Sequence, residues 1–115
     1  MPLGVPGRIE HLWFALTDPD DNGKFLGANL TGYELYKDTT VVLESGHPFI
    51  TKKSVIQFSD SKLFEVSNIE FLLSKGYAQK KQPCSSKLLG VIRKGLMDSD
   101  DAPQDMQDYL KRRLA

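Results

Sequence analysis

Residues 44–54 (ESGHPFITKKS) bring together side chains that can move protons and bind phosphate. His47 can exchange a proton near neutral pH, because the unperturbed pKa of histidine is about 6.5. Lys52 and Lys53 can offset negative charge on a phosphoryl oxygen, and the Ser54 hydroxyl can donate a hydrogen bond to it. This segment therefore supplies an acid or base, a cation and a hydroxyl, which are the groups that phosphate chemistry uses.

A second histidine, His11, lies in an apolar segment that we expect to be a strand. If the sheet brings His11 and His47 together, one can take the proton of a ribose 2′-hydroxyl while the other protonates the leaving 5′-oxygen. Each of these roles accelerates a reaction by about 10²–10⁴-fold. RNA cleavage of this kind needs no cofactor and no metal ion. We expect no metal site, since the two histidines and the one cysteine lie far apart in the sequence.

The same residues also have a purely structural interpretation. His47 precedes Pro48 and could only shape a turn, and His11 could be packed within its strand. A further alternative is a small acyl- or phosphoryl-transfer enzyme with Ser54 or Cys84 as its nucleophile. No histidine stands beside Cys84 in the sequence to activate it.

Two tyrosines, Tyr33 and Tyr36, lie in a polar segment that we expect to be a loop. Each could stack on a nucleic-acid base, a contact that contributes about 1–3 kcal/mol. They could equally cover one end of the sheet. The other aromatic side chains lie in apolar segments, which is typical of core residues.

The chain has 115 residues, which predicts one domain spanning residues 1–115. Fifteen basic and fifteen acidic side chains give a net charge of zero, which argues against a histone-like protein that binds nucleic acid over its whole surface. The charge is nevertheless uneven. Residues 51–97 hold nine basic and three acidic side chains, and such a local excess can attract a polyanion.

One cysteine cannot form an internal disulfide, which fits a reducing compartment. No apolar run approaches the roughly 20 residues of a membrane helix. Residues 1–7 lack the basic start and apolar centre of a signal peptide. We therefore expect a cytoplasmic protein with no membrane partner.

The first half of the chain reads as short strands separated by turn signals. Residues 18–23 (DPDDNG) begin like a calcium loop, but Asn29 stands where that loop needs a bidentate glutamate, so a plain turn is expected. In the fourth strand Ser54, Ile56 and Phe58 should share the core face. The expected strands are residues 9–17, 24–31, 39–44, 53–59 and 62–66.

The second half of the chain has helical patterns. Ser67 and Glu70 match a capping box, and Gly76 is a natural helix stop. Ser85 or Ser86 can cap a second helix that reaches Leu96. The last helix should be capped by Asp101, with Pro103 in its first turn.

Strands followed by helices in so short a chain predict an α+β fold. We expect a small curled sheet or barrel over about residues 8–66, with a helical part over about residues 67–114.

Several phrases of the sequence resemble the PemK/MazF-like toxins of bacterial toxin–antitoxin pairs. The resemblance covers roughly residues 7–75. It is carried by residues 11–19 (HLWFALTDP), 25–31 (FLGANLT), 38–43 (DTTVVL), 46–50 (GHPFI) and 54–56 (SVI). It implies an SH3-like antiparallel barrel with added helices, a homodimer, and an endoribonuclease that an antitoxin protein holds inactive.

The resemblance also implies roles for individual residues. Thr31 falls where the family places a hydroxyl beside the scissile phosphate. His11 falls near the position of the family's usual arginine, and Arg8 lies three residues upstream. Residues 46–50 are not general in those toxins and could mark a branch with its own catalytic histidine.

Two hypotheses follow. In the first, the protein is a metal-independent endoribonuclease in which His47 and His11 transfer protons. Lys53, Ser54 and Thr31 would then act on the phosphate, while Lys52, Tyr33 and Tyr36 bind the RNA. In the second, it is a non-catalytic SH3-like module that binds a protein or a nucleic acid.

Overall fold

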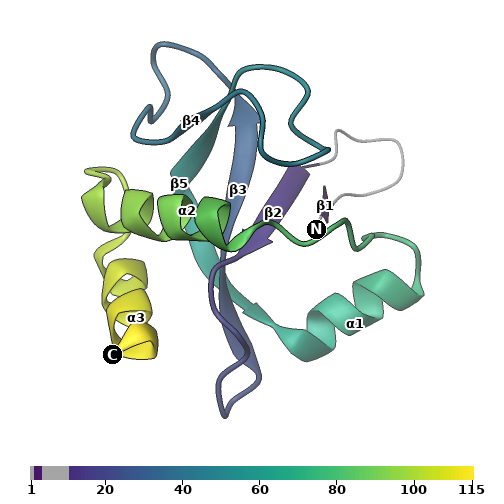
Figure 1. Cartoon of the computed structure of the whole chain (residues 1–115). Coiled ribbons are helices and arrows are strands. Elements are labelled where there is room, and N and C mark those ends of the chain that lie inside the picture. The colour runs from purple at the N-terminus through teal and green to yellow at the C-terminus, as the bar shows by residue number, and fades with distance from the viewer. Residues whose placement is uncertain (1, 4–10) are drawn as a thin grey trace.

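The structure is a computed structural model that describes residues 2–3 and 11–115, with only the backbone described at residues 2, 3 and 11 (Figure 1). Arg8 and the start of the predicted first strand lie outside the described residues. The strands are β1 (Pro2–Leu3), β2 (His11–Ala15), β3 (Lys24–Gly32), β4 (Val42–Leu43) and β5 (Ser54–Glu65). The helices are α1 (Val66–Ser74), α2 (Ser86–Asp98) and α3 (Gln104–Leu114).

Strands β2, β3, β5 and β4 form an antiparallel sheet in that order, and β1 adds two residues beside β2. The register of β3 against β5 shifts in the middle. Gly27 pairs with Lys62 while Asn29 pairs with Gln57, so residues 58–61 lie opposite Ala28 alone. Such a bulge bends a strand without ending it. The two strands predicted at residues 53–59 and 62–66 are therefore one strand.

Alternation along the strands gives the sheet two different faces. On one face, Ile56 and Phe58 join a large buried core, as predicted, and Ser54 is buried on the same side. Helices α2 and α3 complete this core with buried side chains of their own, namely Leu88, Ile92, Leu96, Met106, Tyr109 and Leu110. We call this side of the sheet the core face.

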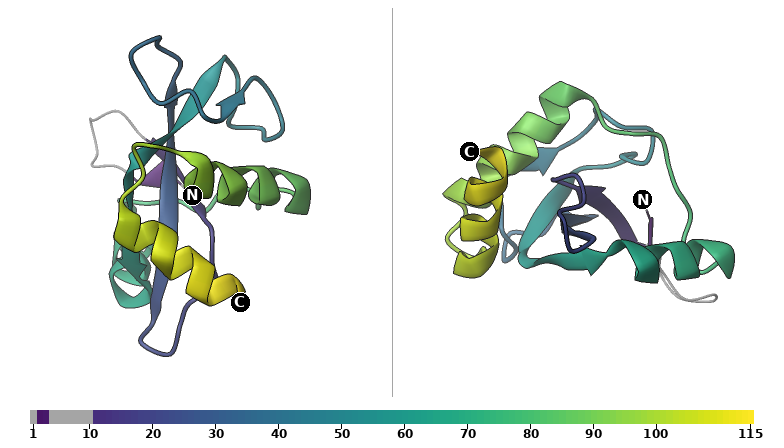
Figure 2. Two further views of the ribbon diagram at one scale, coloured as in Figure 1. Left: turned by 90° about the vertical axis from the view of Figure 1, so that its left-hand side faces the viewer. Right: turned by 90° about the horizontal axis from the view of Figure 1, so that it is seen from below.

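The opposite side, which we call the outer face, carries a smaller apolar cluster. Phe25, Phe64 and Ile69 are buried there, and Trp13 packs against them. The Phe25 and Phe64 rings stack with centroids 5.6 Å apart, and Trp13 meets Phe64 edge to face at 5.0 Å. This cluster holds α1, which lies apart from α2 and α3 (Figure 2).

The expected α+β class is confirmed, but the described strands do not close into a barrel. In a small barrel the inner face is filled by side chains of opposing strands. Here α2 and α3 fill that place, and β1 and β4 stand at opposite edges of the sheet order. The strand expected at residues 39–44 is reduced to Val42 and Leu43, which leaves too short an edge for closure.

The ends of the first two helices test the predicted caps. At the end of α1, Gly76 has φ +75° and its N–H donates to the Leu73 carbonyl, while Tyr77 N–H donates to Leu72. This is the Schellman arrangement that the glycine predicted. The Ser85 side chain caps α2 by accepting a hydrogen bond from Leu88 N–H at 3.1 Å, as expected.

Two predicted caps are wrong. Helix α1 begins at Val66, directly after β5, so Ser67 lies inside its first turn and caps nothing. Val66 N–H donates instead to the Gly23 carbonyl of the β2–β3 turn at 2.9 Å. Helix α3 has Pro103 at its N-cap position and no side-chain cap, so Asp101 does not serve there.

Helix α3 is tied to the turn between β2 and β3. The Asp20 carboxylate accepts hydrogen bonds from the N–H groups of Asn22 and Lys24 and from the Tyr109 hydroxyl, the last at 2.9 Å. The Lys24 N–H and the Tyr109 hydroxyl lower the pKa of Asp20, while burial and the Asp20 carboxylate raise the pKa of Tyr109. The predicted plain turn is thus a hydrogen-bonded hairpin turn fixed by a distant helix.

Candidate functional site

His47 is buried, with 8% of its surface exposed, and both of its ring nitrogens have backbone partners. Nε2 lies 2.6 Å from the Gln82 carbonyl, and Nδ1 accepts a hydrogen bond from Phe49 N–H at 3.1 Å. Its ring also meets the Phe14 ring edge to face, with centroids 6.0 Å apart.

This geometry sets the hydrogen-bonding roles of the two ring nitrogens. A carbonyl can only accept and an N–H can only donate, so Nε2 donates to Gln82 and Nδ1 accepts from Phe49. Because both nitrogens already have backbone partners, one of these hydrogen bonds must break before His47 can exchange a proton with a substrate. The arrangement supports the structural interpretation of His47.

Of the other predicted acid–base and nucleophile candidates, Cys84 lines a cavity of about 260 Å³ together with His47, whereas Ser54 does not. His11 begins β2 and pairs with Leu3, but its side chain lies outside the described part of the structure. Ser54 is buried and its hydroxyl donates to the Lys52 carbonyl at 2.9 Å. Cys84 is a partly buried thiol packed against the large core.

The remaining predicted residues do come together, at the end of β3. Thr31 and Gly32 pair with Val55 and Ser54, and Tyr33 N–H donates to the Lys53 carbonyl. This register places the polar end of β3 beside the start of β5. We call the resulting cluster the lysine patch, and it consists of Thr31, Tyr33, Lys37, Lys52 and Lys53.

Lys37 organises the lysine patch, although the sequence analysis did not single it out. Its ammonium donates to Thr31 Oγ1 at 2.9 Å and to the Gly32 carbonyl at 3.1 Å. Because Thr31 Oγ1 accepts this bond, the proton of its hydroxyl is available to another acceptor. The Lys52 ammonium also lies beside Gly32, 3.7 Å from the position a Cβ would take there.

Aromatic rings accompany the lysines. The Lys53 ammonium lies 4.0 Å from the centroid of the Tyr33 ring, a cation–π contact. Tyr36 stands on the same loop with 83% of its surface exposed, next to the equally exposed Leu35. Tyr36 is therefore free to stack on a ligand.

No lysine of the patch forms an ion pair in the part of the chain that the structure describes, although Lys37 lines a cavity together with Asp38, Asp98, Asp100 and Asp101. Within the described ranges, the one ion pair joins Lys94 and Asp98 on α2. The acidic β2–β3 turn lies at the far end of β3, below the sheet in Figure 1, while residues 33–53 form the loops above it. Nine residues of strand separate the two ends by about 26 Å, which exceeds the screening length of about 8 Å in physiological salt.

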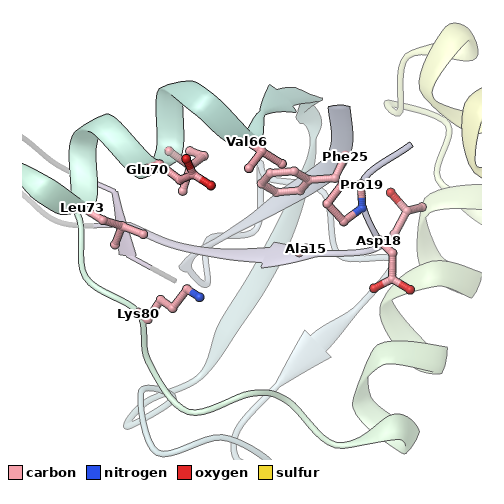
Figure 3. Close-up of a pocket in the computed structure, with 10 residues that line it drawn as sticks. Ala15, Asp18, Pro19, Phe25, Val66, Glu70, Leu73 and Lys80 are labelled. Atoms are coloured by element: carbon pink, nitrogen blue, oxygen red, sulfur yellow. The ribbon is translucent and has the colours of Figure 1, made fainter. Parts of the chain in front are cut away.

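A cavity of about 340 Å³ lies elsewhere, between α1 and the start of the β2–β3 turn (Figure 3). Phe25, Val66 and Leu73 form part of its apolar wall, and Glu70 and Lys80 lie at its margin. It contains none of the predicted site residues. Its apolar lining offers few groups that could bind a phosphate.

Two further results concern the described part of the chain as a whole. No three side chains of histidine, cysteine, aspartate or glutamate in it lie close enough to hold a metal ion. No helix in residues 11–115 has both the length and the apolar character needed to span a membrane.

Comparison of the chain with protein-family models, with curated proteins and with solved structures finds no match. Function is therefore inferred from the side-chain geometry.

Proposed function

We propose that the protein binds single-stranded RNA through the lysine patch. The observation that carries this proposal is that Lys37 bonds to the Thr31 hydroxyl while the ammonium groups of Lys52 and Lys53 lie beside the next two residues of the chain, with none of the three in an ion pair in the described structure. Ammonium groups and a hydroxyl donor are the usual partners of phosphate oxygens. Tyr33 and Tyr36 add rings on which unpaired bases can stack, which favours a single strand over a duplex.

The proposal makes a quantitative statement about salt. Binding to a single strand loses affinity with a logarithmic slope of about −0.7 for each phosphate that is neutralised. Three lysines therefore predict a slope of about −2. Fluorescence anisotropy of a labelled single-stranded RNA of mixed sequence, measured over a range of potassium chloride concentrations, gives this slope.

Single substitutions test whether the salt dependence of binding comes from the lysine patch. We expect Lys37→Met and Lys53→Met each to weaken binding and to bring the slope closer to zero by about 0.7. Lys111→Met removes the same charge from α3, on the side of the molecule away from the loops of the patch, and should leave binding unchanged (Figure 1). Equal losses in all three variants would show that only the overall charge matters, and would refute the proposal.

The bond between Lys37 and Thr31 favours a second candidate, a metal-independent endoribonuclease similar to the PemK/MazF-like toxins. The 2′-oxygen would attack the adjacent phosphorus, forming the 2′,3′-cyclic phosphate as the bond to the 5′-oxygen breaks. Lys37 and Lys53 would stabilise the added negative charge, and Thr31 would hold a phosphate oxygen. His11 is the candidate for taking the 2′ proton, and the leaving 5′-oxygen would take its proton from water. If this candidate is correct, the protein is a cytoplasmic homodimer and an antitoxin protein is its partner. Its open sheet is then related to the SH3-like barrel.

Incubation with RNA in excess EDTA distinguishes the two candidates. An endoribonuclease should release fragments ending in 2′,3′-cyclic phosphate, and Thr31→Val and His11→Ala should each abolish the cleavage. His47→Gln, in contrast, should retain it in whatever fraction is folded. Intact RNA with all proteins, together with salt-dependent binding, would leave the binding function alone.

A further inference from the structure

Three buried polar atoms have no hydrogen-bond partner in the described structure, and all three lie on β3 and β5. They are Asn29 Oδ1, Gln57 Oε1 and Ser61 Oγ. Asn29 and Ser61 are 6% and 5% exposed. Buried polar groups are nearly always hydrogen-bonded, so unpaired ones that lie together indicate a place where another molecule, or water, binds. Asn29 and Gln57 pair directly across the two strands, and we call these two residues the amide site. Ser61 does not belong to it, because it is two residues before Leu63, which packs against the core face.

The register of the strands places the amide site beside the lysine patch. Asn29 pairs directly with Gln57, and Thr31 pairs with Val55 two residues along the same strands. Residues two apart on a strand point to the same face and lie about 7 Å apart. Asn29, Gln57 and Thr31 therefore share the outer face of the sheet, at a spacing that one nucleotide spans between phosphate and base.

The chemistry of the amide site is that of an acceptor. The two unpaired amide oxygens can only accept hydrogen bonds. Asp60 adds a carboxylate beside them, which accepts from Asn29 Nδ2 at 3.5 Å. A ligand that satisfies this set must present N–H groups, and a carboxylate here disfavours a phosphate.

We infer that the amide site binds a nucleobase carrying an exocyclic amino group, on the RNA whose phosphates contact the lysine patch. Asparagine and glutamine amides pair with adenine, and carboxylates accept from the amino group of cytosine. Uracil has one N–H, at N3, but a carbonyl in place of that amino group, so an acceptor of the site would face the uracil O4 acceptor. This inference rests on the proposed RNA binding and adds base preference to it.

Gln57 provides the entrance to the site. Its side chain is only half-buried, and its amide nitrogen has one long hydrogen bond, 3.4 Å to Ser59 Oγ. Breaking this bond lets the amide turn outward to meet a base. Trp13 pairs with Asn29 across β2 and β3, so its indole borders the site, and it is the single tryptophan of the chain.

The test compares oligoadenylate, oligocytidylate and oligouridylate of equal length and label. We expect oligocytidylate and oligoadenylate to bind about 5–150-fold more tightly than oligouridylate, the range that one well-placed base contact supplies. Their binding should also change the Trp13 fluorescence. Oligocytidylate against oligouridylate is the decisive pair, since these pyrimidines differ at the amino group.

Substitution then locates the preference. Gln57→Met keeps the length of the side chain, and it should make the three oligomers bind alike while the salt slope stays the same. Gln57→Ala, which removes the amide at this half-buried position, should have the same effect and serves if Gln57→Met unfolds. The matched control is Gln104→Met on α3, which should change nothing.

The possible outcomes test the RNA binding and the base preference separately. If no oligomer binds, the proposed function and this inference fail together. If all oligomers bind equally to the parent protein, as expected of a site filled only by water, the lysine patch stands and the base site is refuted. A preference that survives both Gln57→Met and Gln57→Ala also refutes it.

Discussion

His47 joins two segments of the chain that lie far apart in sequence. Its ring bridges Phe49 N–H and the carbonyl of Gln82, which is 35 residues away. The hydrogen bonds fix the loop after β4 against the connector that leads into α2. At the scale of a single residue, this histidine connects two loops through its hydrogen bonds.

We therefore expect His47→Ala to lower the free energy of unfolding by about 2–4 kcal/mol, because two backbone groups lose their partners and a buried ring is removed. Urea unfolding followed by circular dichroism measures this loss. RNA affinity, measured at a temperature at which the variant is folded, should not change. If the variant is as stable as the parent but no longer binds RNA, His47 is part of the functional site.

At this scale the sequence predicted residue types better than residue partners. Lys52 and Lys53 were identified from their chemistry and Thr31 from the family resemblance, and the fold brings them together. Lys37 was missed because its role depends on a loop that folds back by six residues. Asn29 and Gln57 were missed because an unpaired buried atom has no signature in sequence.

At the scale of elements, α2 lies against the sheet through a glycine. A Cβ added at Gly95 would lie 2.7 Å from the Phe58 ring and closer still to Val41 Cγ2. Gly90, on the same helix, has nothing within 4 Å of the corresponding position. Gly95 thus allows α2 to pack closely against the core, whereas nothing near Gly90 requires a glycine.

This contrast predicts opposite effects of one substitution. Gly95→Ala should destabilise the protein by about 1–3 kcal/mol, since the helix must move away from the core. Gly90→Ala should stabilise it by about 0.5–1 kcal/mol, because alanine has the higher helix propensity. Thermal unfolding of the two variants beside the parent measures both, and a stabilising Gly95→Ala would contradict the packing described for α2.

The elements themselves were largely predictable, and their junctions were not. Apolar patterns located β2, β3 and the three helices, because burial of a periodic face determines them. The polar run Ser59–Ser61 suggested a break between two strands, but a bulge accommodates it. The cap predicted at Ser67 failed because α1 follows β5 without a loop, and Val66 is paired with Gly23 in the turn of another hairpin.

At the scale of the molecule, a buried carboxylate ties the loop between β3 and β4 to the end of α2. Asp38 accepts hydrogen bonds from the Thr40 hydroxyl at 2.6 Å and from the Ser99 hydroxyl at 2.5 Å, the latter 61 residues away at the end of α2. Burial acts to raise the pKa of Asp38, but the hydrogen bonds from Ser99 and Thr40 outweigh it, so the pKa lies below its ordinary value of 3.8.

A lowered pKa in the folded state makes stability depend on pH in one direction. The ionised Asp38 contributes its full stabilisation above about pH 3.8, and the contribution is lost as the pH falls through the lower folded-state value. We expect Asp38→Asn to cost about 1–3 kcal/mol at neutral pH. Urea unfolding at a series of pH values should show this difference shrinking below pH 3.8. If the difference in unfolding free energy stays constant with pH, the ionised Asp38 is not the stabilising form.

The hydrogen bond between Tyr109 and Asp20 also has a consequence for how the molecule is made. The two residues are 89 positions apart, so at about 5–20 residues per second a ribosome needs roughly 4–18 seconds to pass from one to the other. During that interval the β2–β3 turn exists without its helix, and the core face of the sheet is uncovered. For some seconds during synthesis, the uncovered core face of the nascent sheet can therefore associate with other molecules. This exposure ends when α3 is made and packs against the sheet.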